Sequence, residues 1–438
     1  MTHEHPVAVI GAGPVGLAAA AQLATRGLPF VVVEAGTAVA ASVRQWAHVR
    51  LFSPWRWTTD PAARELLRAT GWREPDPDEL PTGADLVERY LRPLAEHPAI
   101  AANLSLGATV TAISRQGFDK VRGAGRDAAP FVLRLSTGEE LLARAVIDAS
   151  GTWRTPNPLG GNGLPAVGEA QARAAARVFD GMPDVLGEWR HHFAGRAVVV
   201  VGAGHSAMGT LLALAQLATE VPDTRVAWVL RADSPDGSYG GGESDALPAR
   251  GAIGTRLRAL VRAGAIAVHS GFFVREVTAT ALISVDGREV PAEVVVNATG
   301  ARPDHTITAE LRLDVDPILG STRALAPLID PNLHSCGTVP PHGVDELAHP
   351  EPGFFVVGAK SYGRAPTFLL ATGYEQARSV VAALAGDWTA ARDVRLELPA
   401  TGVCSTSLAE PAAAEGADVS CCGTATPLIS LSVSGAAS

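Results

Sequence analysis

The chain has 438 residues, of which 47% are hydrophobic and 18% are charged, and its formal net charge at pH 7 is −9. This length allows roughly two or three domains, and the acidity argues against nucleic acid or an anionic membrane surface as partners, because both repel an acidic protein. With no apolar run of about eighteen residues, no export segment at its start and only four cysteines, we expect a reduced, cytoplasmic enzyme without a disulfide framework.

The first predicted elements, residues 7–34, form a strand, a tight turn, a helix and a second strand. Glycines at residues 11, 13 and 16 give the spacing G-x-G-x-x-G directly after the first apolar run. In this spacing the first glycine permits the turn, the second lets the backbone approach a pyrophosphate, and the third lets the helix pack closely on the sheet. The second strand ends in an acid, where a carboxylate would bind an adenosine ribose. The residues assigned to this dinucleotide site are Gly11, Gly13, Pro14, Gly16 and Glu34.

The next segment, residues 42–57, is rich in tryptophan and follows the ribose-binding acid. We expect it to run along the bound dinucleotide toward the reactive ring, and we assign Arg44, Gln45 and Trp46 as cofactor contacts. Trp46 has an equally good interpretation as a core tryptophan beside Trp55 and Trp57.

A second glycine loop follows a buried strand at residues 198–201. Ala207 takes the place of the third glycine, which a small residue can fill. The next strand ends in an arginine where an NAD site would carry an acid, and this favours the 2′-phosphate of NADPH; an ordinary exposed arginine is the alternative. The residues assigned to this site are Gly202, Gly204, His205, Ser206 and Arg231.

Two more apolar strands, within residues 145–153 and 294–304, each end in a turn of small residues that contains a glycine. Together with the two loops they resemble the two-dinucleotide-binding flavoprotein superfamily over about residues 5–390. The resemblance implies FAD in the first site, NADPH in the second, and cofactor contacts at Ser150, Gly151 and Gly300. It also implies an α/β fold of two Rossmann-like, doubly wound, three-layer domains, with the NADPH domain inserted in the FAD domain. The expected boundaries are 1–190 and 301–398 for FAD, 191–300 for NADPH, and 399–438 for a flexible tail.

The loop "GAGHSA" is similar to the GxGxSA loop of flavin-containing monooxygenases and their N-hydroxylating relatives. Those enzymes carry F-x-G-x-x-x-H-x-x-x-W just before this loop. Here Phe179, Gly181 and Trp189 keep the pattern, but Val185 stands in place of the histidine, which leaves a reductase or oxidase as an alternative to a monooxygenase. Disulfide reductases of the thioredoxin-reductase type need C-x-x-C or C-x-x-x-x-C, which the sequence lacks.

The late segment, residues 354–384, resembles the second flavin-binding motif of the superfamily. It begins as a strand that leads to Gly358, and we expect a helix from Thr367 whose N-terminus faces the flavin; both residues are assigned to the cofactor. The candidates for catalysis are three residues that precede this helix: Lys360, Tyr362 and Arg364. A cation here would stabilise negative charge on the reduced flavin, and a solvated loop charge is the alternative.

Two loops have alternative interpretations. The glycine-rich residues 237–251 form either a lid over the nicotinamide or a plain surface loop. Cys336 lies between His334 and His342, but the spacing fits no zinc pattern, so we expect a thiol there and not a metal ligand.

The tail, residues 399–438, consists mainly of small residues and contains Cys404, Cys421 and Cys422. Adjacent Cα atoms lie about 3.8 Å apart and disulfides usually need about 4.4 Å, so the neighbouring pair suits a dithiol. Three thiolates would match a soft ion such as trivalent arsenic. The alternative is a disordered tail with incidental cysteines.

The stretches "HVRLFSPWRW", "GGGESDALPARGA", "DPNLHSCGTVPPHG" and "GAKSYGRAPTFLL" resemble FAD-dependent oxidoreductases of bacterial arsenic-resistance operons. The sequence thus predicts an NADPH-dependent FAD monooxygenase that acts with O2 on a small soft nucleophile such as arsenite or an organoarsenical. The alternatives are a flavin reductase or oxidase without oxygen transfer, and a flavoprotein that binds thiophilic ions. No nucleic-acid or membrane partner is expected, and an oligomer is left open.

Overall fold

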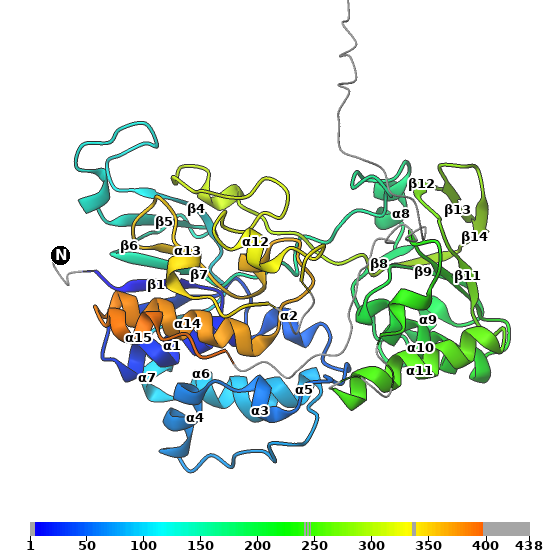
Figure 1. The fold of residues 1–438 in the computed structure, drawn as a ribbon, viewed down its shortest axis with the longest axis horizontal. Coiled ribbons are helices and arrows are strands. Elements are labelled where there is room, and N and C mark those ends of the chain that lie inside the picture. Colours follow the sequence, from blue (N-terminus) through cyan, green and yellow to red (C-terminus); the bar gives the residue numbers. More distant parts are fainter. Residues whose placement is uncertain (1–4, 241, 243–244, 246, 335–338, 397–438) are drawn as a thin grey trace, which may run out of the picture. The chain divides into compact units, whose positions relative to one another are not determined.

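The computed structural model of the chain describes residues 5–240, 242, 245, 247–334 and 339–396, and Figure 1 shows how their elements are arranged. In this part of the chain there are two five-stranded sheets, in the orders β16-β7-β1-β2-β3 and β11-β10-β9-β15-β8, and two antiparallel three-stranded sheets. All neighbouring strands within each five-stranded sheet run parallel. No described helix has both the length and the apolar character needed to cross a membrane.

The first parallel sheet is covered on both faces. Because successive side chains of a strand point to opposite faces, Val7 and Val9 of β1 pack with helices α1 and α14, whereas Ala8 and Ile10 pack with the antiparallel sheet β4-β5-β6. Figure 1 shows these helices and this small sheet on opposite sides of β1 and β7. The strands are β1 (Val7–Ile10), β2 (Phe30–Val33), β3 (Leu104–Ser105), β4 (Val110–Arg115), β5 (Phe131–Leu135), β6 (Glu140–Ala143), β7 (Ala145–Asp148) and β16 (Phe354–Val356).

Helix α1 is rich in alanine and buried from Val15 to Leu23, which fits close packing between the sheet and α14. The helices of this region are α1 (Pro14–Thr25), α2 (Ala41–Arg44), α3 (Trp55–Thr58), α4 (Pro61–Arg68), α5 (Gly83–Leu86), α6 (Arg92–Glu96), α7 (Pro98–Ala101), α12 (Ala326–Ile329), α13 (Val344–Leu347), α14 (Leu370–Leu384) and α15 (Trp388–Arg392). A π-helix, η1 (Val87–Leu91), and the 3₁₀ turns η2 (Arg126–Ala128), η5 (Thr306–Thr308) and η6 (Gly358–Tyr362) complete it.

The second parallel sheet repeats this layering. Val198 and Val200 of β9 pack with α10 and α11, and Val199 and Val201 pack with the antiparallel sheet β12-β13-β14. The strands are β8 (Val178–Asp180), β9 (Ala197–Val201), β10 (Arg225–Val229), β11 (Ala267–His269), β12 (Val274–Val277), β13 (Ala281–Ser284), β14 (Glu289–Pro291) and β15 (Val294–Asn297). The helices are α8 (Glu169–Ala174), α9 (Arg190–Phe193), α10 (His205–Glu220), α11 (Pro248–Arg262) and the 3₁₀ turn η3 (Asp236–Ser238).

The two parallel sheets, each with its own pair of covering layers, confirm the expected α/β fold with two dinucleotide-binding units. Strand β8 pairs with β15, so the second sheet already takes up residues before 191, where we expected the NADPH domain to begin. The division of the chain into an FAD domain and an inserted NADPH domain stays a prediction.

Candidate cofactor and active site

The turn between β1 and α1 needs its first and third glycines for different reasons. Gly11 has φ +95°, a left-handed conformation that favours glycine, and a Cβ there would lie 2.9 Å from the carbonyl oxygen of Ala149. At Gly16 a Cβ would lie 1.9 Å from the carbonyl oxygen of Gly11. A Cβ on Gly13, by contrast, would meet nothing described within 4 Å. The second glycine therefore faces open space that a phosphate can fill.

Glu34 is fixed against this turn. Its side chain is buried, and its two oxygens accept hydrogen bonds of 2.7 Å from the backbone N–H groups of Ala12 and Gly36. The carboxylate thus lies at the glycine loop, at the end of β2, where the sequence predicted a ribose-binding acid.

Two long helices begin close to this turn. Helix α1 has Gly13 as its N-cap and α14 has Leu369, and neither helix receives a hydrogen bond from a capping side chain. The helices pack tightly, since a Cβ on Gly373 would lie 2.5 Å from a methyl group of Val15. Their free N–H groups and positive dipole ends suit an anionic ligand.

The sequence placed the start of the last helix at Thr367, but the structure places it at Leu370. Thr367 is nevertheless buried next to this start, and its hydroxyl has no hydrogen-bond partner among the described residues. The same holds for Thr372, in the first turn of α14, which the sequence reasoning missed. Buried hydroxyls without partners are costly, so both are candidates to contact a bound cofactor.

Lys360 is not a solvated loop charge, which was the alternative to a cation that acts on the flavin. Its side chain is 2% exposed, and its Nζ donates a hydrogen bond of 2.7 Å to Oδ2 of Asp148, which is fully buried. Ser150 completes the group: its hydroxyl donates to the other carboxylate oxygen of Asp148 at 2.6 Å and accepts from Lys360 at 3.3 Å. Asp148 was not singled out from the sequence. The signal that could have found it is a charged residue at the end of the otherwise apolar strand β7.

The other two candidates for catalysis lie in different surroundings. Tyr362 is buried, and its ring contacts those of His342 and Phe368 at centroid distances of 5.5 and 5.4 Å. Arg364 is exposed. The structure therefore does not gather Lys360, Tyr362 and Arg364 into one cationic cluster, and their catalytic roles stay predictions.

His342 belongs to a buried hydrogen-bond network behind this segment. Its Nδ1 lies 3.0 Å from the carbonyl oxygen of Pro340 and its Nε2 lies 3.1 Å from Nε2 of Gln376. Because the carbonyl can only accept, Nδ1 carries the proton and Nε2 accepts from the amide. Burial lowers the pKa of His342, which keeps the ring neutral. Gln376 in turn accepts from the N–H of Gly358 at 2.8 Å, so the network holds the turn after β16.

The three residues assigned to the flavin in segment 42–57 have different contacts. Arg44 forms a half-exposed ion pair with Glu88 at 3.1 Å. Gln45 accepts a hydrogen bond of 2.7 Å from the indole of Trp153, which links it to the turn after β7. Trp46 packs directly on Gly83, where a Cβ would lie 2.8 Å from the indole ring. Their contacts with a flavin stay predictions.

The second glycine loop repeats the geometry of the first. Gly202 has φ +137°, and a Cβ there would lie 2.3 Å from the carbonyl oxygen of Ala298. A Cβ on Gly204 would meet nothing described within 4 Å, and α10 begins after it without a capping side chain. The turn after β15 reaches Gly300, at φ +87°, as the turn after β7 reaches Gly151. Both loops thus fit a dinucleotide.

His205 opens helix α10 and is covered by an aromatic ring. Its ring lies 5.1 Å from that of Phe52, and burial together with the nearby charge of Arg250 lowers its pKa to about 4. The imidazole is therefore neutral at pH 7. Arg231 follows β10 and is exposed, which leaves its guanidinium accessible to a ligand.

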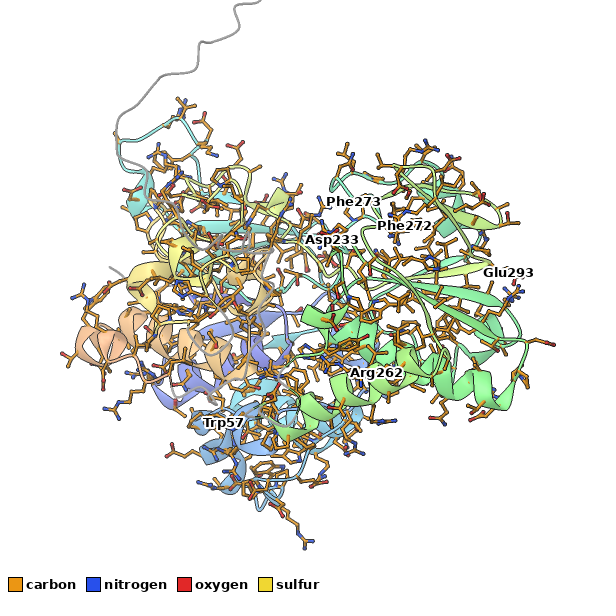
Figure 2. The ribbon with its side chains drawn as sticks, turned by 45° about the vertical axis from the view of Figure 1, so that its right-hand side comes forward. Trp57, Asp233, Arg262, Phe272, Phe273 and Glu293 are labelled. Atoms are coloured by element: carbon orange, nitrogen blue, oxygen red, sulfur yellow. The ribbon has the colours of Figure 1, made fainter. Side chains whose placement is uncertain are left out.

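A cavity of about 340 Å³ lies beside Phe52. Its lining combines three segments, within residues 52–57, 78–80 and 247–249, and Figure 2 labels one of its residues, Trp57. The lining residues are Phe52, Pro54, Arg56, Trp57, Asp78, Leu80, Leu247, Pro248 and Ala249. The sequence did not predict this cavity, because nothing in the glycine-rich residues 237–251 indicates that they lie beside residues 52–57.

The residues of the interrupted monooxygenase pattern pack against one another or into the neighbouring core. Phe179 contacts Trp189 edge-on with 5.7 Å between ring centroids. Val185, at the position of the missing histidine, is 1% exposed and belongs to the hydrophobic core of this region. The valine thus has a packing role that a polar side chain could not fill without a partner.

No group of three or more histidine, cysteine or acidic residues in the described part of the chain could hold a metal ion. Cys336 and the proposed thiophilic ligands Cys404, Cys421 and Cys422 lie outside the described residues. The tail site stays a prediction from the sequence.

Known proteins resemble the chain in sequence and in fold. The sequence model of the family described as pyridine nucleotide-disulphide oxidoreductase matches residues 8–318. Indole-3-pyruvate monooxygenase YUCCA1 of Oryza sativa subsp. japonica is 34% identical over 218 residues, which cover 47% of this chain and 44% of that protein. The chain therefore matches less than half the length of this curated relative.

Two solved structures share the fold. Bacillithiol disulfide reductase from Bacillus cereus has a TM-score of 0.64 at 20% identity, over 87% of this chain and 99% of that chain. A flavin-containing monooxygenase from Stenotrophomonas maltophilia has a TM-score of 0.56 at 21% identity, over 88% of this chain and 99% of that chain. At these identities the likeness shows the fold alone.

Proposed function

This chain belongs to the pyridine nucleotide-disulphide oxidoreductase family, whose members depend on FAD and NAD(P)H, and on that premise we propose that it is an NADPH-dependent FAD monooxygenase acting on a small soft nucleophile. The observation that carries the proposal is the pair of glycine loops, each with an open second glycine and a helix N-terminus free of side-chain caps. FAD would occupy the loop beside Glu34 and NADPH the loop beside Arg231.

A bound flavin would supply the redox chemistry between NADPH and O2, with one oxygen atom going to the substrate and the other to water. The chain's own groups bind and orient. The backbone N–H groups at the starts of α1 and α14 receive the anionic parts of FAD, and Glu34 is fixed by Ala12 and Gly36 to meet the ribose. Neutral His205, in contact with the ring of Phe52, opens α10 without adding a charge beside the NADPH phosphates.

Arsenite and organoarsenicals are the candidate substrates, because the sequence resembles oxidoreductases of arsenic-resistance operons and its tail carries three thiols. A cytoplasmic location, inferred from the sparse cysteines, belongs to the same proposal. The cavity beside Phe52 is a place for a substrate that passes between solvent and flavin.

An NADPH-dependent flavin reductase or oxidase is the second candidate. Val185 favours it, because this position is core packing and not the histidine of the monooxygenase pattern. The fold shared with a bacillithiol disulfide reductase is equally compatible with a reductase.

Stoichiometry separates the two candidates. The purified holoprotein is given NADPH in air with and without arsenite or an organic thioether, and NADPH consumed, H2O2 released and oxygenated product are measured. A monooxygenase forms one product per NADPH and releases little peroxide when its substrate is present. Equal amounts of NADPH consumed and peroxide released with every nucleophile would overturn oxygen transfer and leave the oxidase. Failure of the protein to bind FAD would overturn both.

A further inference from the structure

The ion pair between Asp148 and Lys360 lies at the edge of the sheet where the dinucleotide loop begins. We propose that this pair keeps the charge beside the bound flavin compensated, so that neither charge alone shifts the flavin's reduction potential, with Asp148 as a positioning residue that acts through Lys360. The inference rests on the proposed FAD site and goes beyond it, since it assigns a role to a carboxylate that neither the loop pattern nor the candidates for catalysis include.

The location follows from the strand register. Asp148, the last residue of β7, is paired with Ile10, the last residue of β1, so the two strands reach the glycine loop together. The residue after Asp148 touches the loop itself, because its carbonyl oxygen lies 2.9 Å from where a Cβ of Gly11 would be. From the other side, a Cβ on Gly358 would lie 3.3 Å from Val15 in the first turn of α1. Lys360 thus comes from a turn that packs on the cofactor-binding helix.

The burial of this pair calls for a reason other than stability. Both side chains are at most 2% exposed, and their charged atoms are 2.7 Å apart. Removing two charges from water costs about as much as their attraction returns, so an apolar pair of the same volume would often serve stability as well. Charges kept in the dry part of a cofactor site act on the cofactor with little screening.

The two charges of the pair have opposite effects on the reduction of a nearby flavin. Reduction adds negative charge to the flavin, so a lone ammonium nearby would favour the reduced form and a lone carboxylate would oppose it. In the pair these effects nearly cancel. Ser150 holds the carboxylate through two hydrogen bonds, from its N–H at 3.0 Å and from its hydroxyl at 2.6 Å. The charge of Lys360 also reaches Asp304, whose pKa is lowered mainly by hydrogen bonds from Thr306.

Three variants of the FAD-bound protein test the pair: Asp148→Asn, Lys360→Met and the double variant. The midpoint potential of the bound flavin is measured by reduction against a reference dye. We expect Asp148→Asn to raise the potential, Lys360→Met to lower it, and the double variant to return close to the unmodified protein.

A matched control is Glu351→Gln, which breaks an equally buried ion pair with Arg126 ahead of β16, at the opposite end of that strand. It should lower stability and leave the potential unchanged. Single variants that retain FAD at an unchanged potential, or that shift it in the same direction, would overturn the inference while the FAD site stands. If one single variant does not fold, the other still tests the sign of the remaining charge, and the double variant must bind FAD at nearly the original potential. A large shift in the double variant contradicts charge compensation. An unmodified protein that binds no FAD would overturn the proposed function itself.

Discussion

At the scale of single residues, the glycines of the first loop have separable roles. Gly16 is required by the fold, because any Cβ would lie 1.9 Å from the carbonyl oxygen of Gly11, whereas Gly13 faces open space. We expect Gly16→Ala to lower the melting temperature of the FAD-free protein. Gly13→Ala should leave that temperature nearly unchanged and weaken FAD binding at least tenfold, because its methyl group occupies the pyrophosphate's path. Thermal denaturation and FAD titration of both variants check this, and equal losses of stability would contradict the separation.

Arg231 is the residue on which we expect the choice of coenzyme to depend. Replacing it by glutamate places a carboxylate where the 2′-phosphate of NADPH is expected, so the KM for NADPH should rise tenfold or more and that for NADH should change little. Arg225, exposed at the other end of β10, provides the matched control: Arg225→Glu should alter neither KM. Equal effects of Arg231→Glu on the two coenzymes would remove the NADPH assignment.

Asp60 introduces a pH dependence. Its carboxyl is buried at the N-cap of α4, and burial raises its pKa from 3.8 to about 6. Since the folded pKa exceeds the unfolded one, ionisation opposes folding, so this group lowers stability as pH rises from about 4 to 6. Asp60→Asn keeps an oxygen for the cap and removes the penalty. Relative to the unmodified protein it should gain stability over that range, by up to about 3 kcal/mol. A stability difference that stays constant from pH 4 to 8 would contradict this.

At the scale of elements, a buried cluster ties the antiparallel sheet of the first region to the segment before β16. Glu351 accepts hydrogen bonds from Arg115 in β4 at 2.8 Å and from Arg126 in η2 at 2.6 Å, and all three side chains are at most 2% exposed. Glu351→Gln leaves two buried guanidinium groups without their counter-charge.

This substitution should lower the free energy of unfolding by about 3–5 kcal/mol. The exposed pair of Arg134 and Glu140, 2.7 Å apart, gives the comparison: Glu140→Gln should cost less than about 1 kcal/mol. Urea denaturation measures both, and similar costs would show that burial does not control the strength of these pairs.

The element scale also shows which expectations could be made from sequence. Strand–glycine–helix units were predicted correctly because each loop begins with a glycine at positive φ, and the first loop also needs Gly16, where a Cβ would lie 1.9 Å from a carbonyl oxygen. Local geometry is therefore recorded in the residue type. The start of α14 was placed three residues early, because Leu369, the N-cap of this helix, still has an extended backbone. Val185 and Trp46 could not be assigned from sequence, because both owe their burial to partners that no short motif contains.

At the scale of the whole molecule, the sequence predicts that the tail, residues 399–438, lies outside the fold that forms both glycine loops. We therefore expect a chain ending at Pro399 to bind FAD and oxidise NADPH as the full chain does. If the tail thiols capture a thiophilic substrate, the shortened chain should lose turnover of arsenite alone and keep basal NADPH oxidation. Loss of FAD on shortening would show that the tail belongs to the fold.

The sequence by itself predicted the family and the two glycine loops, because each loop depends on neighbours within about thirty residues of a β-α-β unit. The roles of Glu34 and Arg231 in telling the two coenzymes apart stay predictions. Only the tertiary structure decided the state of the charges. Lys360 has the same sequence context whether it is solvated or paired, and its partner Asp148 lies 212 residues away. Burial of a charge depends on which distant groups the fold brings to it, and for that reason the pairing of Lys360 with Asp148 is visible only in the assembled sheet.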